Sequence, residues 1–154
     1  NDTLWGGDGD DLILGGDGEL EGELKALAEA EGLGADLSFP GWVVDKNAFF
    51  AQLDIFVLPS LHEPFGIVLI EAMACEVPVV GSTCGAIPSV LGDAGLVFPE
   101  GDTAGLRDAL RRLRESPGLR AELAARGRQR VLDQYTDARI AGATLDIYRQ
   151  VLGL

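Results

Sequence analysis

Two glutamates eight residues apart, Glu63 and Glu71, are the residues whose type and spacing indicate chemistry in this sequence. Pro64 follows the first of them, and proline suits the first turn of a helix because its missing N–H has no partner there in any case. The sequence therefore predicts a helix from about Phe65 to Cys75, with Glu71 two turns inside it. Carboxylates are good partners for sugar hydroxyls, so one hydroxylated ligand could meet both glutamates.

The start of this expected helix also suits an anion. Backbone N–H groups are free at a helix N-terminus and the helix dipole is positive there, so each favourable contact to an anion contributes about 0.3 to 1 kcal/mol. The relevant amides are those of Phe65, Gly66 and Ile67, and Gly66 would let a phosphate approach closely. The segment thus predicts binding of a ligand that carries both phosphate and hydroxyl groups.

The elements that position these residues alternate between short β-branched runs and longer amphipathic segments. The expected strands are Asp11–Leu14, Asp36–Phe39, Ile55–Leu58, Val77–Val80 and Gly95–Phe98. The expected helices are 19–31, 47–53 and 65–75, and after Pro99 three more at 103–115, 117–135 and 137–152, which should pack on the sheet. This rhythm predicts an α/β fold, a Rossmann-like parallel sheet with flanking helices, whose ligands bind at the carboxyl ends of the strands.

The length, charge and cysteine content of the chain limit the kinds of protein it can be. A chain of 154 residues is enough for one compact domain. The formal charge of −13 argues against nucleic acid or an anionic membrane as partner. No apolar run reaches the length of a transmembrane segment. Cys75 and Cys84 have no metal-ligand or CxxC spacing, so we expect buried thiols in a cytoplasmic protein.

The N-terminus allows two interpretations. Residues 6–14 fit the nonapeptide of calcium-binding β-rolls, with Asp8, Asp10 and Asp11 as possible ligands, but such sites need stacked turns and the sequence has at most two partial ones. We favour a sheet strand followed by an exit loop. Residues 1–10 are then a Gly/Asp-rich segment of uncertain origin, and 11–154 a truncated α/β domain, since the chain begins with Asn1 and not Met.

From Glu63 to Glu71 the sequence reproduces the E-x7-E motif of the group 1 (family 4-like) retaining glycosyltransferases of GT-B fold. Other landmarks resemble that family in order along the chain: 16–18 (GDG), 37–43 (LSFPGWV), 74–80 (ACEVPVV), 85–88 (GAIP) and 98–102 (FPEGD). The resemblance runs from about residue 12 to the end and is to the C-terminal, donor-binding half of the enzyme.

This resemblance implies a role for each matching residue. Glu63 would be the catalytic residue, binding the hydroxyls of the transferred sugar, and the amides after Phe65, including those of Gly66 and Ile67, would hold the sugar and distal phosphate. Glu71 would bind the ribose. The nucleobase would lie near residues 42–43, Trp42 and Val43. The resemblance also implies a UDP- or GDP-linked sugar donor, no metal or other cofactor, and an acceptor bound by an N-terminal domain that this chain lacks.

Departures from the family pattern qualify this interpretation. The Arg and Lys that normally neutralise the donor diphosphate have no counterpart here, so we expect the isolated chain to be inactive. Glu76 replaces a glycine common at the helix end, at some cost in capping stability, and Ser89 replaces a frequent glutamate. His62 is interpreted as a solvated neighbour, and Trp42 as either a core residue beside Phe39 or a base-stacking residue.

The sequence leaves three other interpretations of the chain open. Both motif glutamates could be ordinary surface or capping carboxylates. The chain could be a calcium-binding β-roll segment fused to a degenerate α/β domain, or a non-catalytic nucleotide-binding module that serves a partner.

The arginines at 107, 111, 112 and 114 are interleaved with acids, which is typical of a solvated helix face.

Overall fold

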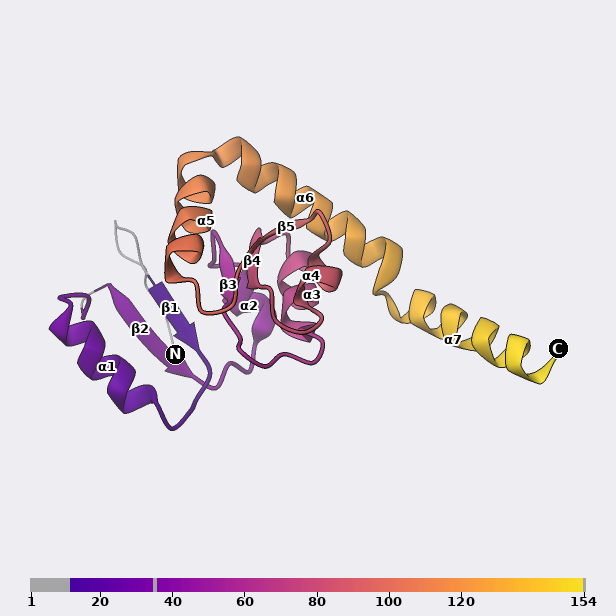
Figure 1. Cartoon of the computed structure of the whole chain (residues 1–154), viewed down its shortest axis with the longest axis horizontal. Helices are drawn as coiled ribbons and strands as arrows, with labels where there is room; N and C mark the ends of the chain where they lie inside the picture. The colour runs from indigo at the N-terminus through magenta and orange to yellow at the C-terminus, as the bar shows by residue number, and fades with distance from the viewer. Residues whose placement is uncertain (1–11, 35, 154) are drawn as a thin grey trace. The chain divides into compact units, whose positions relative to one another are not determined.

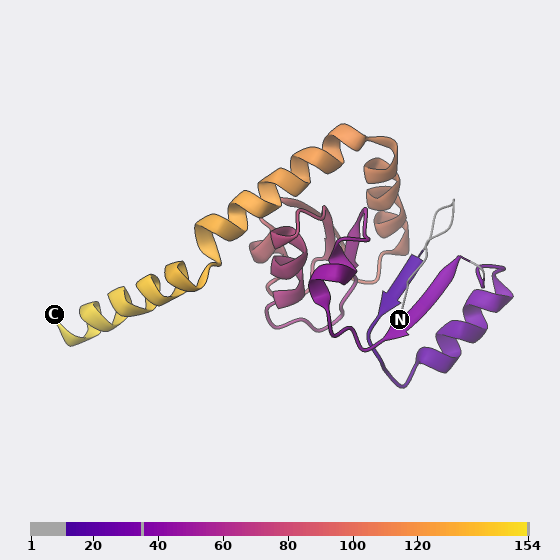
Figure 2. The ribbon, with the colours of Figure 1, turned by 180° about the vertical axis from the view of Figure 1, so that it is seen from behind.

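A computed structural model describes residues 12–34 and 36–153 of the chain (Figure 1, with the reverse view in Figure 2). Contacts divide the chain into two compact units, Asn1–Lys46 and Asn47–Leu154, here called unit 1 and unit 2. The expected N-terminal segment 1–10, and the possible calcium ligands Asp8, Asp10 and Asp11, lie outside the described residues.

Unit 1 is a strand–helix–strand unit built from β1 (Leu12–Gly15), α1 (Glu21–Ala30) and β2 (Leu37–Gly41). The two strands are parallel, with Leu12 opposite Leu37, and the Leu12 amide donates to the Asp36 carbonyl over 2.8 Å. The strand expected from Asp36 to Phe39 therefore begins one residue later and continues to Gly41. The parallel direction follows from the crossover through α1.

Unit 2 contains three parallel strands in the order β3–β4–β5. Its elements are α2 (Lys46–Phe50, whose first residue belongs to unit 1), β3 (Phe56–Leu58), α3 (Ile67–Ala74), β4 (Val79–Ser82), α4 (Ile87–Leu91), β5 (Gly95–Phe98), α5 (Thr103–Glu115), α6 (Pro117–Gln134) and α7 (Asp137–Leu152). The expected parallel α/β architecture is confirmed. The described strands pair as two sheets, β1–β2 and β3–β4–β5.

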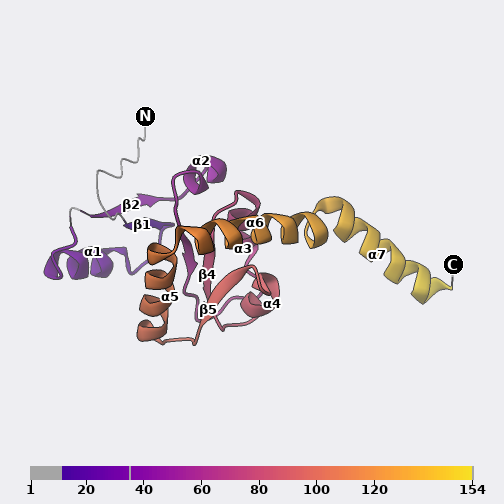
Figure 3. The ribbon, with the colours of Figure 1, turned by 90° about the horizontal axis from the view of Figure 1, so that it is seen from above.

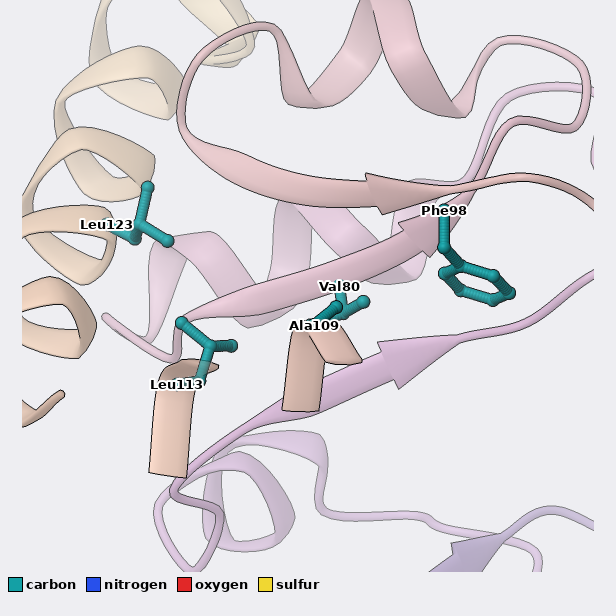
Figure 4. Close-up of a cluster of buried hydrophobic side chains, with 5 residues drawn as sticks. All are labelled: Val80, Phe98, Ala109, Leu113 and Leu123. Atoms are coloured by element: carbon teal, nitrogen blue, oxygen red, sulfur yellow. The ribbon is translucent and has the colours of Figure 1, made fainter. Parts of the chain in front are cut away.

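Helices cover both faces of the β3–β4–β5 sheet because neighbouring residues of a strand point to opposite sides. Val80 of β4 packs with Ala109 and Leu113 of α5. Gly81, the next residue, faces α4, and a Cβ atom there would lie 2.4 Å from Ile87 Cγ2. Figure 4 shows the buried cluster on the α5 side, formed by Val80, Phe98, Ala109, Leu113 and Leu123.

Three arginines of α6 hold the C-terminal ends of earlier helices, where unsatisfied carbonyls carry partial negative charge. Nη1 of Arg120 donates to the Leu113 carbonyl of α5 over 2.7 Å. Arg128 donates to the Ala74 carbonyl of α3. On α4, Nε and Nη2 of Arg130 donate to the carbonyls of Val90 and Ser89, both over 2.7 Å. α6 thus ties together the C-terminal ends of α3, α4 and α5.

One short helix was missed from the sequence, and one expectation about helix packing is wrong. α4 was not anticipated, because it has only five residues and contains Pro88. α7, which follows α6 in Figure 3, has no buried residue, so it does not pack on the sheet as expected. Among the described residues, no helix is both long and apolar enough to cross a membrane.

Candidate functional site

The candidate site is the loop from Pro59 to Gly66, which joins β3 to α3. α3 begins at Ile67, two residues later than the sequence suggested, because Gly66 adopts φ +83° and is the N-cap residue. Pro64 therefore precedes the helix and does not occupy its first turn. A Cβ atom at position 66 would lie 3.0 Å from Leu69 Cδ1, so this left-handed, closely packed position requires glycine.

The Glu63 carboxylate accepts two backbone amides of the residues that immediately precede α3. Its Oε1 atom accepts the Gly66 N–H over 2.9 Å and the Phe65 N–H over 3.4 Å. Two of the three amides expected to face an anion are therefore engaged by a carboxylate of the protein itself. Because an ionised carboxylate has about four acceptor positions, the half-buried Glu63 keeps capacity to accept from a ligand hydroxyl.

Glu71 lies on α3 itself, four residues after Ile67 and hence a little over one turn into the helix. The sequence had placed it two turns inside, because the expected helix began earlier. Its side chain is half-buried and its Oε2 atom is buried. Glu63 and Glu71 thus come from one strand–loop–helix junction, the first from the loop and the second from the helix.

The loop is supported from two neighbouring parts of unit 2. The Phe65 ring packs edge-on against Tyr135 at the end of α6, with ring centroids 6.3 Å apart. Ser82, at the end of β4, donates from Oγ to the Ser60 carbonyl over 2.6 Å. The α-carbon of Gly85 lies close to the Glu63 carbonyl. From the sequence, residues 85–88 were identified only as a family landmark, and Ser82 was not identified at all. The position of this serine at the end of an apolar strand is a signal that could have found it.

The residues expected near the nucleobase lie apart from this junction in the chain. Trp42 and Val43 follow β2 in unit 1. Trp42 is 74% exposed, so the expectation that it fills the core beside Phe39 is wrong. His62 is exposed. No group of three or more His, Cys, Asp or Glu side chains that could hold a metal occurs in the described part of the chain.

The fold is that of the C-terminal half of the GT-B glycosyltransferases. Sucrose-phosphate synthase from Thermosynechococcus elongatus superposes with a TM-score of 0.80 at 29% identity, over 92% of this chain and 38% of that one. HepE from Anabaena, solved in complex with UDP, superposes with a TM-score of 0.82 at 24% identity, over 94% of this chain and 41% of that one.

The sequence comparison agrees with the fold. The family profile described as "Glycosyl transferases group 1" matches residues 8–116, and the chain belongs to this family. The lipopolysaccharide core biosynthesis glycosyltransferase LpsE of Rhizobium meliloti is 36% identical over 139 residues, which is 88% of this chain and 41% of the relative. The chain thus spans about two fifths of the length of this relative.

Proposed function

We propose that this chain is the donor-binding part of an enzyme that transfers a glycosyl group from a nucleotide sugar to an acceptor, with retention of configuration. The observation that carries the proposal is the Glu63 carboxylate, held by the Gly66 and Phe65 amides at the start of α3 in a family of glycosyltransferases. These contacts hold the carboxylate beside the start of α3, next to the amides proposed to meet the donor.

In this proposal each residue of the junction has a distinct task. Glu63 accepts hydrogen bonds from hydroxyls of the transferred sugar and favours the positive charge that develops at its anomeric carbon. The amides of Phe65, Gly66 and Ile67, at the positive end of α3, face the sugar and distal phosphate. Glu71 accepts from the ribose hydroxyls.

Binding of a phosphate to these amides has a structural requirement. The Gly66 amide donates to Glu63 Oε1 in the structure described here. A donor phosphate could use the same amide only if the Glu63 side chain shifted toward the sugar. We therefore propose that donor binding transfers amide contacts from the carboxylate to the phosphate.

The nucleobase is assigned to Trp42 and Val43 of unit 1. The exposure of the Trp42 indole leaves its face available for stacking. The nucleotide is of the UDP or GDP type, and the complex of HepE with UDP makes UDP the first nucleotide to test.

The acceptor side of the reaction is proposed to lie in another domain, N-terminal to the donor-binding part. Retention would follow a front-face route in which the leaving diphosphate itself activates the acceptor, so no protein base is invoked. Because no Arg and Lys pair matching the family's diphosphate clamp is found in the sequence, we expect no turnover by these 154 residues alone. We also propose that the domain extends over residues 11–154. A cytoplasmic location is proposed as well, because the thiols of Cys75 and Cys84 are free.

A thermal-shift panel of UDP, GDP and their sugar derivatives tests the proposal. A ligand at one hundred times its dissociation constant adds about 2.7 kcal/mol to the free energy of unfolding, which is several degrees for a chain of this size. We expect one nucleotide to stabilise the chain and Glu71→Ala to lose that response. No response to any nucleotide, with a response to calcium instead, would contradict the proposal and return the function to the N-terminal segment.

A further inference from the structure

We infer that Gly85 is a positioning residue for Glu63, an inference that rests on the proposed function because Glu63 is the proposed sugar-binding carboxylate. Gly85 follows β4 and has φ +52°, a conformation that L side chains rarely adopt. A Cβ atom built there would lie 2.0 Å from the carbonyl oxygen of Glu63 and 3.1 Å from its carbonyl carbon. The obstacle is backbone, which cannot swing aside as a flexible side chain can.

A second contact joins the same two loops. Ser82 is 1% exposed, and its Oγ atom donates to the Ser60 carbonyl in the loop that carries Glu63. The same Oγ accepts the Cys84 N–H over 3.4 Å, just before Gly85. One buried hydroxyl therefore fixes the β3–α3 loop against the β4–α4 loop, and Gly85 sets how closely they approach.

The consequence of a side chain at position 85 follows from these distances. Contacts of a Cβ atom below 3.0 Å essentially never occur, so we expect alanine at this position to push the backbones of residues 85 and 63 apart by at least about 1 Å. A shift of that size breaks the 2.9 Å hydrogen bond from the Gly66 amide to Glu63 Oε1, and it displaces the carboxylate from a bound sugar.

Hydrogen exchange of the Gly66 amide tests the positioning without any ligand. We expect Gly85→Ala to accelerate this exchange about tenfold, as Glu63→Ala should, because the amide loses its acceptor. The matched control is Gly101→Ala, since Gly101 also has positive φ (+75°) but a Cβ atom there would meet nothing within 4 Å. Equal Gly66 exchange in the Gly85→Ala and Gly101→Ala variants would overturn the inference.

A second variant covers the case in which Gly85→Ala does not fold. Ser82→Ala removes the hydroxyl that joins the two loops without adding volume, and we expect it to accelerate Gly66 exchange as well, by about threefold. Core amides such as that of Val80 serve as the reference for global stability in every variant. Acceleration at Gly66 and Val80 by the same factor would indicate general destabilisation and would contradict a positioning role.

Binding of UDP and UDP-glucose separates this inference from the proposed function. In Gly85→Ala we expect the Kd of UDP to stay within twofold and that of UDP-glucose to rise about tenfold, because only the sugar meets Glu63. Equal weakening of both ligands would contradict the positioning role. If the wild-type chain binds neither of these nor GDP and GDP-mannose, the proposed function fails, while the exchange experiment still decides whether Gly85 sets the position of Glu63.

Discussion

The Gly66 amide donates to Glu63 Oε1 over 2.9 Å, so the carboxylate proposed to meet the donor sugar also holds the left-handed residue that precedes α3. A hydrogen bond from a backbone amide to an ionised carboxylate is charge-assisted and stronger than one between neutral groups. Glu63 therefore stabilises the fold and is proposed to serve the reaction from one position. The two roles can be separated by choosing substitutions that keep or remove the acceptor oxygen.

Replacing Glu63 tests its structural role. Glu63→Ala removes the acceptor of two amides, and we expect a loss of about 1 kcal/mol in the free energy of unfolding. Glu63→Gln keeps an acceptor oxygen and should cost about half as much. Asp102→Ala is a positive control, since Asp102 caps α5 by accepting the Gly105 amide over 2.9 Å. Urea denaturation measures all three, and a Glu63→Ala variant as stable as wild type would show that the hydrogen bonds from the Phe65 and Gly66 amides to Glu63 are not formed in solution.

Glu76 offers a stabilising substitution. It is the one non-glycine residue with positive φ among those described, at +59°. It occupies the C′ position of a Schellman motif in which the Glu76 amide donates to Met73 and the Val77 amide to Ala72, each over 3.1 Å. Glycine is preferred here because a Cβ atom strains the left-handed conformation.

We expect Glu76→Gly to raise the free energy of unfolding by about 1 kcal/mol. Glu76→Ala is the control, because it removes the carboxylate but keeps the Cβ atom, and it should give little gain. The comparison is made by chemical denaturation at fixed pH. If both variants were equally stabilised, charge and not backbone strain would be the cause.

Arg130 should resist conservative replacement. Its Nε and Nη2 atoms each donate over 2.7 Å to carbonyls at the end of α4, a forked geometry that a lysine ammonium cannot reproduce. We expect Arg130→Lys to cost about 1 to 2 kcal/mol of stability. The control is Arg126→Lys on the same helix, where an exposed pair with Glu122 contributes at most about 0.5 kcal/mol. Similar costs for the two variants would contradict this account of how α6 is anchored.

The sequence predicted the strands well and the local details less well. Runs such as Val77–Val80 and Gly95–Phe98 are short, apolar and bounded by turn residues. The second matches β5, whereas the first was placed two residues too early, because β4 is Val79–Ser82. The start of α3 was misplaced because Pro64 suggests a first turn. The observed arrangement, with Gly66 as a left-handed N-cap residue whose amide donates to Glu63, depends on how the loop folds.

Other features depend on residues far apart in the sequence. The contact of Gly85 with the Glu63 carbonyl, and the bonds from Arg130 to residues 40 and 41 positions earlier, are set by the packed fold and not by local pattern. The helix expected at 137–152 matches α7, but its environment was not predicted, because a helical pattern does not say which surface a helix meets. Glu63 and Glu71 were found because they lie only eight residues apart in the sequence, so their motif can be recognised without knowing the fold.

The most direct test of the account is the affinity of wild type and Glu63→Ala for UDP and for UDP-glucose, measured by calorimetry. We expect the wild type to bind UDP-glucose more tightly than UDP. We further expect Glu63→Ala to weaken the binding of UDP-glucose by about tenfold or more and to leave that of UDP within twofold, because the carboxylate meets only the sugar. Equal affinities of wild type and Glu63→Ala for UDP-glucose would contradict the assignment of Glu63 as the sugar-binding carboxylate.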